Sequence, residues 1–457
     1  MFVNRVDELA QLRHWWEKNH RMCVVWGRRR VGKSALVEEF SRSLPTVFHV
    51  GARRPAAEEL TLLSQLVHAT VPDSIRDLLR QPYVNWDDAL AHLGAVAERE
   101  PLLLVLDEFA ELTESSPELP GVLRAFWDRA ESRTKLRILL CGSAVRHMEA
   151  MQEYRAPLYG RFDLSLLVHP FQPHEAALLL PDLAPAERAL VYGLLGGTPL
   201  YLSWWDQSAD LRTNLLSLFG RPGNRGVAEA QLVLATEVER GGLPAAVLHA
   251  IAGGRNRYGQ IKDLVRAEPA RTLDRLIQLR LVERVVPVTE REDRSRRGFY
   301  RITDNFLAFY LQVVSNYYGQ IQRGRGSAVI SEMVNRLPDY MGSQWEEMFR
   351  WHLGRLVMEG QITQQFVDLG PWWNDSSNIE IDAVVLSGRS RVPVLAGEAK
   401  WTSTVDADRL LPILRSNAAA IPGANVDEMR FALCARNEVR GAPDDVLTIT
   451  AADIMTP

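Results

Sequence analysis

Two glycines, a lysine and a serine at fixed spacing are the first residues of the chain that could do chemistry. Four residues separate Gly27 from Gly32, and Lys33 and Ser34 follow directly. In a loop of this kind the glycines let backbone N–H groups close around phosphates, the lysine reaches the terminal phosphates, and the serine hydroxyl ligates Mg²⁺. We therefore predict a nucleoside triphosphate site formed by Gly27, Arg28, Arg29, Arg30, Val31, Gly32, Lys33, Ser34 and Ala35.

An apolar strand and a helix must position this loop. Residues 23–26 form an apolar run that ends at Gly27, as a buried strand would. Leu36, Val37 and Phe40 then recur at helical spacing. The loop is therefore expected at a helix N-terminus, where the helix dipole favours an anion such as phosphate.

Two acids at the end of another apolar run complete this site. Residues 102–106 are apolar and suit a strand buried on both faces, and Asp107 and Glu108 follow them. Asp107 would hold Mg²⁺ through water, while Glu108 would orient and deprotonate the attacking water. The alternative is that two acids merely end a strand, but the loop upstream favours the catalytic interpretation.

Ser143 and Arg161 are further candidates for phosphate contacts. The apolar run 136–142 delivers Ser143 to the same sheet edge, where its hydroxyl could sense the γ-phosphate. Arg161 could supply positive charge to the phosphoryl transition state, either in its own chain or across a subunit boundary of a homo-oligomer. A solvated arginine is the alternative for Arg161.

Six segments occur in an order that indicates a family. They are FVNRVDEL, GRRRVGKS, LVLDEF, GSAV, PLYGRFDLSLLVHPF and GGTPLYL. Over about residues 1–220 the chain resembles the archaeal-type ATPases of the AAA+/STAND group, which are P-loop NTPases. The resemblance implies ATP and Mg²⁺ as cofactors and places Arg5 and Pro199 at the border of the adenine pocket. Asn4 departs from the acid or glycine that the family has at this border.

The middle of the chain predicts a winged helix-turn-helix. Helices over residues 244–252 and 258–265, and a third that carries Leu273 and Leu276, precede an apolar strand, a charged tip and a returning strand. The arginines that could meet DNA phosphates are Arg266, Arg271, Arg275, Arg280, Arg294, Arg296 and Arg297. Acids are interleaved with them, as on a salt-bridged surface, so the alternative is a packing module that relays the nucleotide state to the last domain.

Four residues of the tail could hold and use a metal ion. Glu346 lies on the apolar stripe of a predicted helix, whereas Glu347 lies off that stripe and is interpreted as a solvated acid. Asp382 stands in an extended run, and a turn leads to a second run in which Glu398 and Lys400 share a face. Closure of this hairpin would bring Asp382 within reach of Glu398.

These positions suit metal-dependent hydrolysis. Asp382 and Glu398 would bind Mg²⁺, and Lys400 would orient or activate a water, while Glu346 would hold a second ion or an outer water. The segment YRITDNFLAFYLQVV resembles the opening of a C-terminal domain of unknown function in archaeal-type ATPases, and the order of helices and strands after it resembles the PD-(D/E)XK nuclease fold. A charge cluster that only supports the hairpin is the alternative.

The composition limits what surrounds these sites. With 457 residues, 46% of them hydrophobic, the chain is long enough for about three domains with their own cores. Cys23, Cys141 and Cys434 lie in separate apolar runs, which argues against a disulfide framework. A net charge of −4 predicts that any DNA contact is local. The chain shows neither a signal-peptide pattern nor an apolar run of the roughly 20 residues that a membrane helix needs, so we expect a cytoplasmic protein without a membrane partner.

We expect an α/β fold in four parts. These are a P-loop ATPase core with a parallel sheet over residues 1–170, a helical lid over 171–235, a winged helix over 236–320 and an α/β PD-(D/E)XK nuclease-like domain over 321–457. The favoured function is an ATP-driven switch that acts on DNA through the nuclease-like domain, in defence, mobile-element control or repair. One alternative is a STAND-type regulator that binds partners or DNA without cleavage, and another is a defence effector triggered by a protein ligand.

Overall fold

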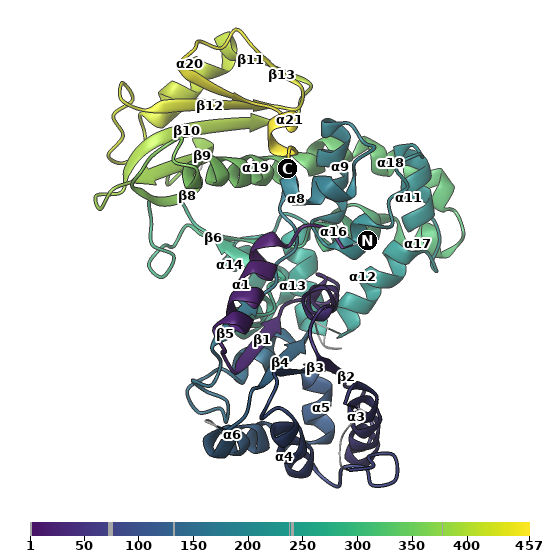
Figure 1. Cartoon of the computed structure of the whole chain (residues 1–457). Coiled ribbons are helices and arrows are strands. Elements are labelled where there is room, and N and C mark those ends of the chain that lie inside the picture. The colour runs from purple at the N-terminus through teal and green to yellow at the C-terminus, as the bar shows by residue number, and fades with distance from the viewer. Residues whose placement is uncertain (1, 72–75, 131–132, 237, 239–241, 377) are drawn as a thin grey trace. The chain divides into compact units, whose positions relative to one another are not determined.

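A computed structural model describes residues 2–71, 76–130, 133–236, 238, 242–376 and 378–457. Its internal contacts separate two units, one that ends at Pro170 and one that begins at Phe171 (Figure 1). The boundaries predicted near residues 235 and 320 fall inside the second unit and stay predictions.

A five-stranded parallel sheet with the order β2-β3-β4-β1-β5 is the centre of the first unit. Its strands are β1 (Met22–Trp26), β2 (Thr46–Val50), β3 (Leu102–Asp107), β4 (Leu136–Gly142) and β5 (Leu164–Leu167). The carboxyl ends of parallel strands share one edge, where α/β proteins bind their ligands. The residues that follow β1, β3 and β4 therefore meet at that edge.

Helices cover both faces of this sheet, which is why β1, β3 and β4 are buried along their whole length. Cys23 and Val25 of β1 pack with α1 and α2, whereas Met22 and Val24 enter a core shared with α3 to α7. These helices are α1 (Val6–Glu17), α2 (Lys33–Ser41), α3 (Ala56–Thr70), α4 (Trp86–Val96), α5 (Phe109–Ser115), α6 (Leu119–Ala130) and α7 (Val145–Ala150).

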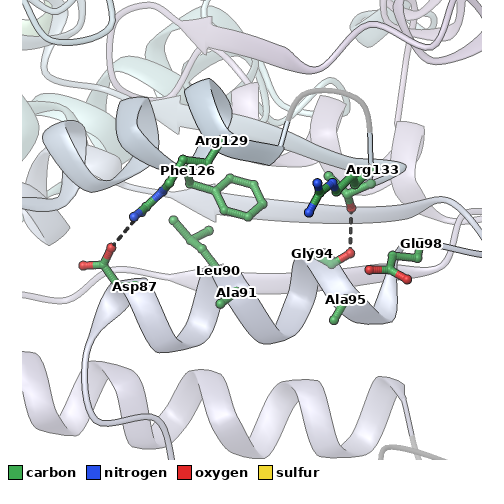
Figure 2. Close-up of a pocket in the computed structure, with 10 residues that line it drawn as sticks. Asp87, Leu90, Ala91, Gly94, Ala95, Glu98, Phe126, Arg129 and Arg133 are labelled. Carbon is green, nitrogen blue, oxygen red and sulfur yellow. Dashed lines mark hydrogen bonds and ion pairs between the residues drawn. The ribbon is translucent and has the colours of Figure 1, made fainter.

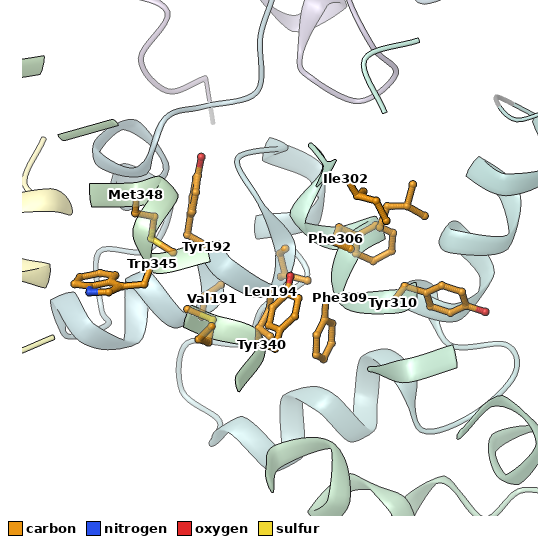
Figure 3. Packing of buried hydrophobic residues seen from close by; sticks show 14 of the residues in the cluster. Val191, Tyr192, Leu194, Ile302, Phe306, Phe309, Tyr310, Tyr340, Trp345 and Met348 are labelled. Carbon is orange, nitrogen blue, oxygen red and sulfur yellow. The ribbon is translucent and has the colours of Figure 1, made fainter. Parts of the chain in front are cut away.

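The second unit begins with short helices that share one hydrophobic core with later segments. Figure 3 shows Tyr192 of α9, Phe306 and Phe309 of α16, and Tyr340 of α19 in this core. The aromatic segment around Phe306 is thus buried, as its helical spacing predicts. The helices involved are α8 (Pro173–Ala176), η1 (Ala177–Leu179), α9 (Pro185–Leu195), α10 (Pro199–Leu202), α11 (Leu211–Phe219), α12 (Arg225–Thr236), α16 (Asn305–Gln312), η2 (Val314–Tyr317), α17 (Tyr318–Gln322), α18 (Gly326–Asn335) and α19 (Leu337–Met358).

Three helices followed by a two-stranded antiparallel hairpin lie between α12 and α16, where the sequence predicts them. They are α13 (Gly242–Ala252), α14 (Tyr258–Val265), α15 (Ala270–Gln278), β6 (Val282–Val285) and β7 (Phe299–Ile302). Leu273 and Leu276 are the buried residues of α15, so its apolar stripe faces the core. We call β6, β7 and the loop between them the β6–β7 hairpin.

A mixed five-stranded sheet with the order β14-β12-β10-β9-β8 forms the end of the chain. The antiparallel pair β9 and β10 is the predicted hairpin, and Ser387 pairs with Val392 next to its turn. α19 packs on one face of the sheet and α20 on the other (Figure 1). The elements are β8 (Phe366–Trp373), β9 (Glu380–Ser387), β10 (Val392–Lys400), β11 (Thr404–Asp406), α20 (Ala407–Ala418), β12 (Arg430–Ala435), β13 (Glu438–Arg440), β14 (Val446–Ile449) and α21 (Ala451–Ile454).

The predicted α/β class, with a parallel sheet in the first unit, is confirmed. Cys23, Cys141 and Cys434 are buried free thiols in β1, β4 and β12, where the apolar runs place them. Among the described residues, no helix combines the length and the apolar character needed to cross a bilayer.

Candidate functional site

The loop between β1 and α2 has the backbone geometry of a phosphate cradle. Gly27 and Gly32 have φ angles of 151° and 95°, which favour glycine. A Cβ atom on Gly27 would lie only 2.4 Å from the backbone oxygen of Val168, so the loop passes directly against the end of β5. The backbone of residues 27–32 can therefore approach a ligand closely, and Gly32 begins the helix that follows.

The side chain of Lys33 lies against the loop that would bind the phosphates, and the side chain of Ser34 lies against Asp107, the expected Mg²⁺ ligand. Lys33 Nζ donates to the carbonyl oxygen of Arg28 in the loop at 2.8 Å, and Ser34 Oγ donates to Asp107 Oδ2 at 2.7 Å. Burial lowers the pKa of the Lys33 ammonium, while Asp107 and Glu108 act in the opposite direction. The lysine thus lies in a dry site beside two carboxylates, where an anionic ligand would gain most from it.

Glu108 is held by its neighbours in a fixed position after β3. Its φ angle of 49° places it in the left-handed region, and its N–H donates to Asp107 Oδ1 at 2.8 Å. Ser143, which follows β4, donates its hydroxyl to Glu108 Oε2 at 2.9 Å. The structure therefore brings together Lys33, Ser34, Asp107, Glu108 and Ser143 at the carboxyl edge of the parallel sheet.

The side chains of Ser34 and Asp107 fit Mg²⁺. A hydroxyl and a carboxylate oxygen are hard ligands of the kind that Mg²⁺ takes in nucleotide sites, together with water and phosphate. Their hydrogen bond at 2.7 Å shows that both oxygens already face one point. When bound there, the ion would neutralise charge on the phosphates.

The structure does not bring Arg161 to this group. Arg161 lies just before β5, near Asp163, whose carboxylate accepts from the N–H of Met22 at the start of β1. That position is the amino edge of the sheet, opposite Glu108, and Arg161 pairs with Asp128 at 2.8 Å. A role for Arg161 within its own chain does not fit this placement, and a role across a subunit boundary stays a prediction.

The two residues predicted at the adenine border are described in different units. Arg5 is buried and donates to the carbonyl oxygen of Val31 at 2.8 Å, so it contacts the phosphate loop directly. Pro199 begins α10 in the second unit. The adenine contact of both residues stays a prediction.

A separate hollow lies between α4 and α6, and none of the predicted site residues lines it. Figure 2 shows Leu90 and Phe126 in its apolar part, with the ion pair between Asp87 and Arg129 at 3.3 Å near one end. The hydroxyl of Thr134 donates to the carbonyl oxygen of Gly94 at 2.8 Å. Its charged groups are paired with one another or stand at its rim, and we assign it no part in the chemistry.

Asp382, Glu398 and Lys400 lie close together where β9 begins and β10 ends. Ala383 pairs with Gly397, which places Asp382 beside Glu398 and the residues that follow it. Lys400 Nζ lies 2.5 Å from Glu398 Oε1 and 3.9 Å from Asp382 Oδ2. Asp382 is buried, and its Oδ2 also accepts the N–H of Ala399 at 2.8 Å.

Two further carboxylates, Glu346 and Glu380, share this environment. Burial raises the pKa of Glu346 to about 8 and that of Glu398 to about 7, and the charge of Asp382 adds to both shifts. Burial and Asp382 also raise the pKa of Glu380, which sequence reasoning missed although it lies two residues before Asp382, on the same strand face. We call Glu346, Glu380, Asp382, Glu398 and Lys400 the tail cluster.

The tail cluster has the donor chemistry of a metal site but not a complete set of arranged ligands. Within the described ranges, no three Asp, Glu, His or Cys side chains are placed to hold an ion together. The Lys400 ammonium stands between Asp382 and Glu398, where a cation would compete with it. The predicted metal ligation by Glu346, Asp382 and Glu398 therefore stays a proposal.

The tail cluster predicts a pH-dependent stability in the absence of divalent ions. Glu346 has an ordinary pKa of 4.5 and a raised value of about 8, so its protonated form stabilises the fold, and this contribution is lost as the pH rises through about 8. We expect Glu346→Gln to raise the midpoint of thermal unfolding at pH 8.5 by about 2 °C or more, and to raise it much less at pH 5.5, because most of the loss occurs between these two pH values.

Thermal unfolding in EDTA at both pH values measures this effect. Glu359→Gln, an exposed position at the end of the same helix, is the matched control and should behave as wild type at each pH. Equal shifts of Glu346→Gln at both pH values would contradict the assignment.

The β6–β7 hairpin is docked on the C-terminal sheet. Arg297 Nη1 donates to the carbonyl oxygen of Trp373 in β8 at 2.9 Å and pairs with Asp375 at 2.8 Å. The N–H of Val288 donates to the carbonyl oxygen of Pro371 at 2.9 Å. Arg297 is therefore engaged within the chain, which favours the alternative of a packing module for this part of the hairpin.

Other arginines of this region remain candidates for phosphate contacts. Arg266 and Arg271 on the helices and Arg294 and Arg296 in the hairpin loop are exposed, whereas Arg275 and Arg280 are partly buried. A surface hollow at the loop is lined by Glu290, Arg291, Arg294, Ser295, Arg296, Arg297 and Asp375. DNA contact by these residues stays a prediction.

The interpretation of Glu347 as a solvated acid is wrong. Its Oε2 accepts from Arg301 of β7 at 2.6 Å and from Arg350 of α19 at 2.8 Å. Although burial acts to raise it, these guanidinium groups hold the pKa of Glu347 well below its usual range. Glu347 is thus a partly buried ion-pair partner.

Two family models match the chain. Residues 2–204 match an ATPase domain found predominantly in Archaea, and residues 310–410 match a family of archaeal and bacterial proteins of unknown function. The first match contains the complete loop and both acids of the nucleotide site. The second contains Glu346, Asp382, Glu398 and Lys400.

Individual proteins from Archaea are similar to the chain. An uncharacterized protein of Methanocaldococcus jannaschii is 25% identical over 418 residues, which cover 89% of this chain and 89% of that protein. An uncharacterized ATP-binding protein of the same organism is 46% identical over 41 residues, which cover 9% of this chain and 70% of that protein. A Walker-type ATPase of Pyrococcus abyssi has a similar fold, with a TM-score of 0.53, 22% identity and coverage of 68% of this chain and 96% of that chain.

Proposed function

We propose that the protein binds ATP with Mg²⁺ and hydrolyses it at the site formed by Lys33, Ser34, Asp107 and Glu108, starting from the match of residues 2–204 to an ATPase domain found predominantly in Archaea. The backbone of the loop and Lys33 bind the β- and γ-phosphates. Ser34 and Asp107 hold Mg²⁺, which neutralises phosphate charge when bound.

Glu108 takes the proton of the attacking water. A carboxylate fixed at the sheet edge by Ser143 and by the left-handed backbone can orient a water for attack in line with the departing phosphate. Water's oxygen forms the new bond to the γ-phosphorus, the bond from that phosphorus to the β–γ bridging oxygen breaks, and the products are ADP and phosphate. Ser143 is well placed to sense the γ-phosphate because it touches Glu108 directly.

The observation that carries this proposal is the convergence of Lys33, Ser34, Asp107 and Glu108 from two separate strand ends, those of β1 and β3. Phosphate release from ATP by the full chain, compared with the Lys33→Ala and Glu108→Gln variants, tests it. Release by wild type that both substitutions suppress supports the proposal. Release that neither substitution changes contradicts it.

For the tail cluster we propose a nuclease-like, Mg²⁺-dependent action on DNA, driven by ATP turnover. Support comes from the buried Asp382 beside Glu398 and Lys400 on one hairpin and from the raised pKa of Glu398, since an excess of close carboxylates favours a divalent ion. In this mechanism the Lys400 ammonium orients the attacking water, and Asp382 and Glu398 would hold the ion that stabilises charge on the phosphate.

A second function is favoured by a specific observation. The Lys400 ammonium already lies between Asp382 and Glu398, and the β6–β7 hairpin is docked on β8. These contacts support a STAND-type regulator, in which ATP occupancy controls assembly or binding and the tail cluster only stabilises the C-terminal domain. Triggering by a protein ligand is compatible with either function.

Plasmid nicking separates the two functions. The full chain is incubated with supercoiled DNA and Mg²⁺ or Mn²⁺, with and without ATP, and is compared with Asp382→Ala and Lys400→Ala. For a nuclease we expect both variants to lose cleavage to below about 1% of wild type, while Asp375→Ala, an exposed acid nearby, retains it. No nicking by wild type in any condition, together with nucleotide-dependent oligomers, would establish the regulator instead.

A further inference from the structure

A chain of partly buried ion pairs runs from the β6–β7 hairpin to helix α19. Arg301 of β7 donates through Nε to Glu283 of β6 at 2.6 Å and through Nη1 to Glu347 of α19 at 2.6 Å. These side chains are partly buried, since the exposed fractions of Arg301, Glu347 and Glu283 are 25%, 30% and 41%. The hairpin thus presents a fixed positive charge to the helix that carries Glu346.

The same chain continues from α19 to the tail cluster. Arg350 donates to Glu347 Oε2 through Nη2 at 2.8 Å and through Nε at 3.1 Å. Its remaining group, Nη1, donates to the backbone carbonyl oxygen of Asp382 at 2.6 Å. One guanidinium therefore links the acid held by the hairpin to the peptide of the central carboxylate in the tail cluster.

We propose that Arg350 is a positioning residue for Asp382, and that Arg301 of the β6–β7 hairpin holds Arg350 in place through Glu347. The hairpin then sets the geometry of the tail cluster, whichever DNA contacts its loop makes. This inference deepens the proposed nuclease-like function and rests on it. The contacts from which it is argued all lie within the chain.

The physical reason lies in the cost of leaving a partly buried charge without one of its partners. Glu347 Oε2 accepts hydrogen bonds from two arginines, so loss of Arg301 leaves Glu347 with Arg350 as its partner in this chain of ion pairs. The geometry of the ion pair between Glu347 and Arg350 then changes. Arg350 can then leave the backbone carbonyl of Asp382. A buried carbonyl that loses a charged donor favours a different position.

The amide of Ala399 reports directly on the position of Asp382. The paired residues of β9 and β10 end at Ala383 and Gly397, and beyond them the Ala399 N–H donates to Asp382 Oδ2 at 2.8 Å. If the Asp382 side chain shifts, this amide loses its acceptor and exchanges faster with solvent. The measurement needs no metal, nucleotide or DNA, so it is independent of whether the chain cleaves anything.

Hydrogen–deuterium exchange at Ala399 in the full chain, resolved by overlapping peptides and followed by mass spectrometry, tests the proposal. We expect Arg350→Gln and Arg301→Gln each to speed exchange by about tenfold, since a charge-assisted hydrogen bond is lost. Arg301→Lys keeps the charge toward Glu347 and should restore most of the protection, which a merely space-filling role would not require.

Arg355→Gln is the matched control, because Arg355 lies on the same helix and also donates to backbone carbonyls, those of Thr456 and Asp453 at 3.0 Å and 3.1 Å. It should leave Ala399 unchanged. Unchanged exchange in Arg350→Gln, or equal acceleration in Arg355→Gln, would overturn the proposal. If Arg350→Gln does not fold, the comparison of Arg301→Gln with Arg301→Lys decides, and equal exchange in those two variants also overturns it. Failure of the proposed function would appear as absent nicking in the plasmid assay with the exchange results intact.

Discussion

Glu108→Gln should bind ATP as tightly as wild type and hydrolyse it about two to four orders of magnitude more slowly. Glutamine has the shape of glutamate and can still accept the hydroxyl of Ser143, so the sheet edge keeps its geometry. It cannot take a proton from water, because its side-chain amide is not basic at neutral pH. Binding and turnover therefore separate in this variant, which is what a general base at this position requires.

The measurement combines calorimetric titration with ATP and steady-state phosphate release. Glu111→Gln is the matched control, since Glu111 lies one turn further along α5 and pairs with Arg53 at the surface. We expect the control to turn over ATP at nearly the wild-type rate. Unchanged turnover in Glu108→Gln would remove Glu108 from its assigned role.

Lys33→Ala should weaken nucleotide binding by about 10- to 100-fold. The lysine is 6% exposed, and in the absence of ligand its ammonium contacts the carbonyl oxygen of Arg28 in the loop. Alanine removes the one ammonium group that this loop aims toward the terminal phosphates. The loss should be larger for ATP than for AMP, because AMP lacks the phosphates that the lysine reaches.

Titration of the variant with ATP, ADP and AMP measures this difference. Lys135→Ala is a suitable control, because Lys135 is exposed just before β4 and donates to the carbonyl oxygen of Arg99 at 2.6 Å. Equal affinity of wild type and Lys33→Ala for ATP would show that the nucleotide binds elsewhere.

The nucleotide site could be read from the sequence because its parts are local. Gly27, Gly32, Lys33 and Ser34 lie within one loop, and the strand and helix that hold the loop are its immediate neighbours. Asp107 and Ser143 come from other strands, but each follows an apolar run that could only be a buried strand of a parallel sheet. The shared edge then follows from the topology.

The position of Arg161 relative to the sheet could not be predicted from the sequence. The sequence around Arg161 does not reveal at which edge of the sheet this residue lies, because that depends on where the next strand, β5, begins. The structure places Arg161 next to Asp128 at the amino edge. Charge alone could not distinguish this ion pair from a phosphate contact.

Sequence reasoning could place several residues of the tail cluster near one another, but it could not predict their contacts with distant parts of the chain. The alternation of strand residues placed Asp382, Glu398 and Lys400 together, and the same rule could have added Glu380. Glu347 was misjudged because helical periodicity treats the face away from the local core as solvated. Here that face is covered by Arg301, which lies far away in the sequence, and no local pattern encodes this contact.

Docking of the β6–β7 hairpin is a tertiary feature of the same kind. The loop has the composition of an exposed charged tip, yet Arg297 contacts Trp373 and Asp375 and Val288 contacts Pro371. The contacts with Trp373 and Pro371 use backbone carbonyl oxygens of the edge strand β8, which any sequence supplies. Sequence reasoning therefore left the DNA reader and the packing module open as alternatives.

Identification of the nucleotide bound to Glu108→Gln tests the central claim most directly. The full-length variant and wild type are each incubated with ATP and Mg²⁺, freed of unbound nucleotide by gel filtration, and analysed by ion-exchange chromatography. We predict intact ATP on Glu108→Gln and ADP on wild type. Recovery of ADP from the variant, or of no nucleotide from either protein, would contradict ATP hydrolysis at this sheet edge.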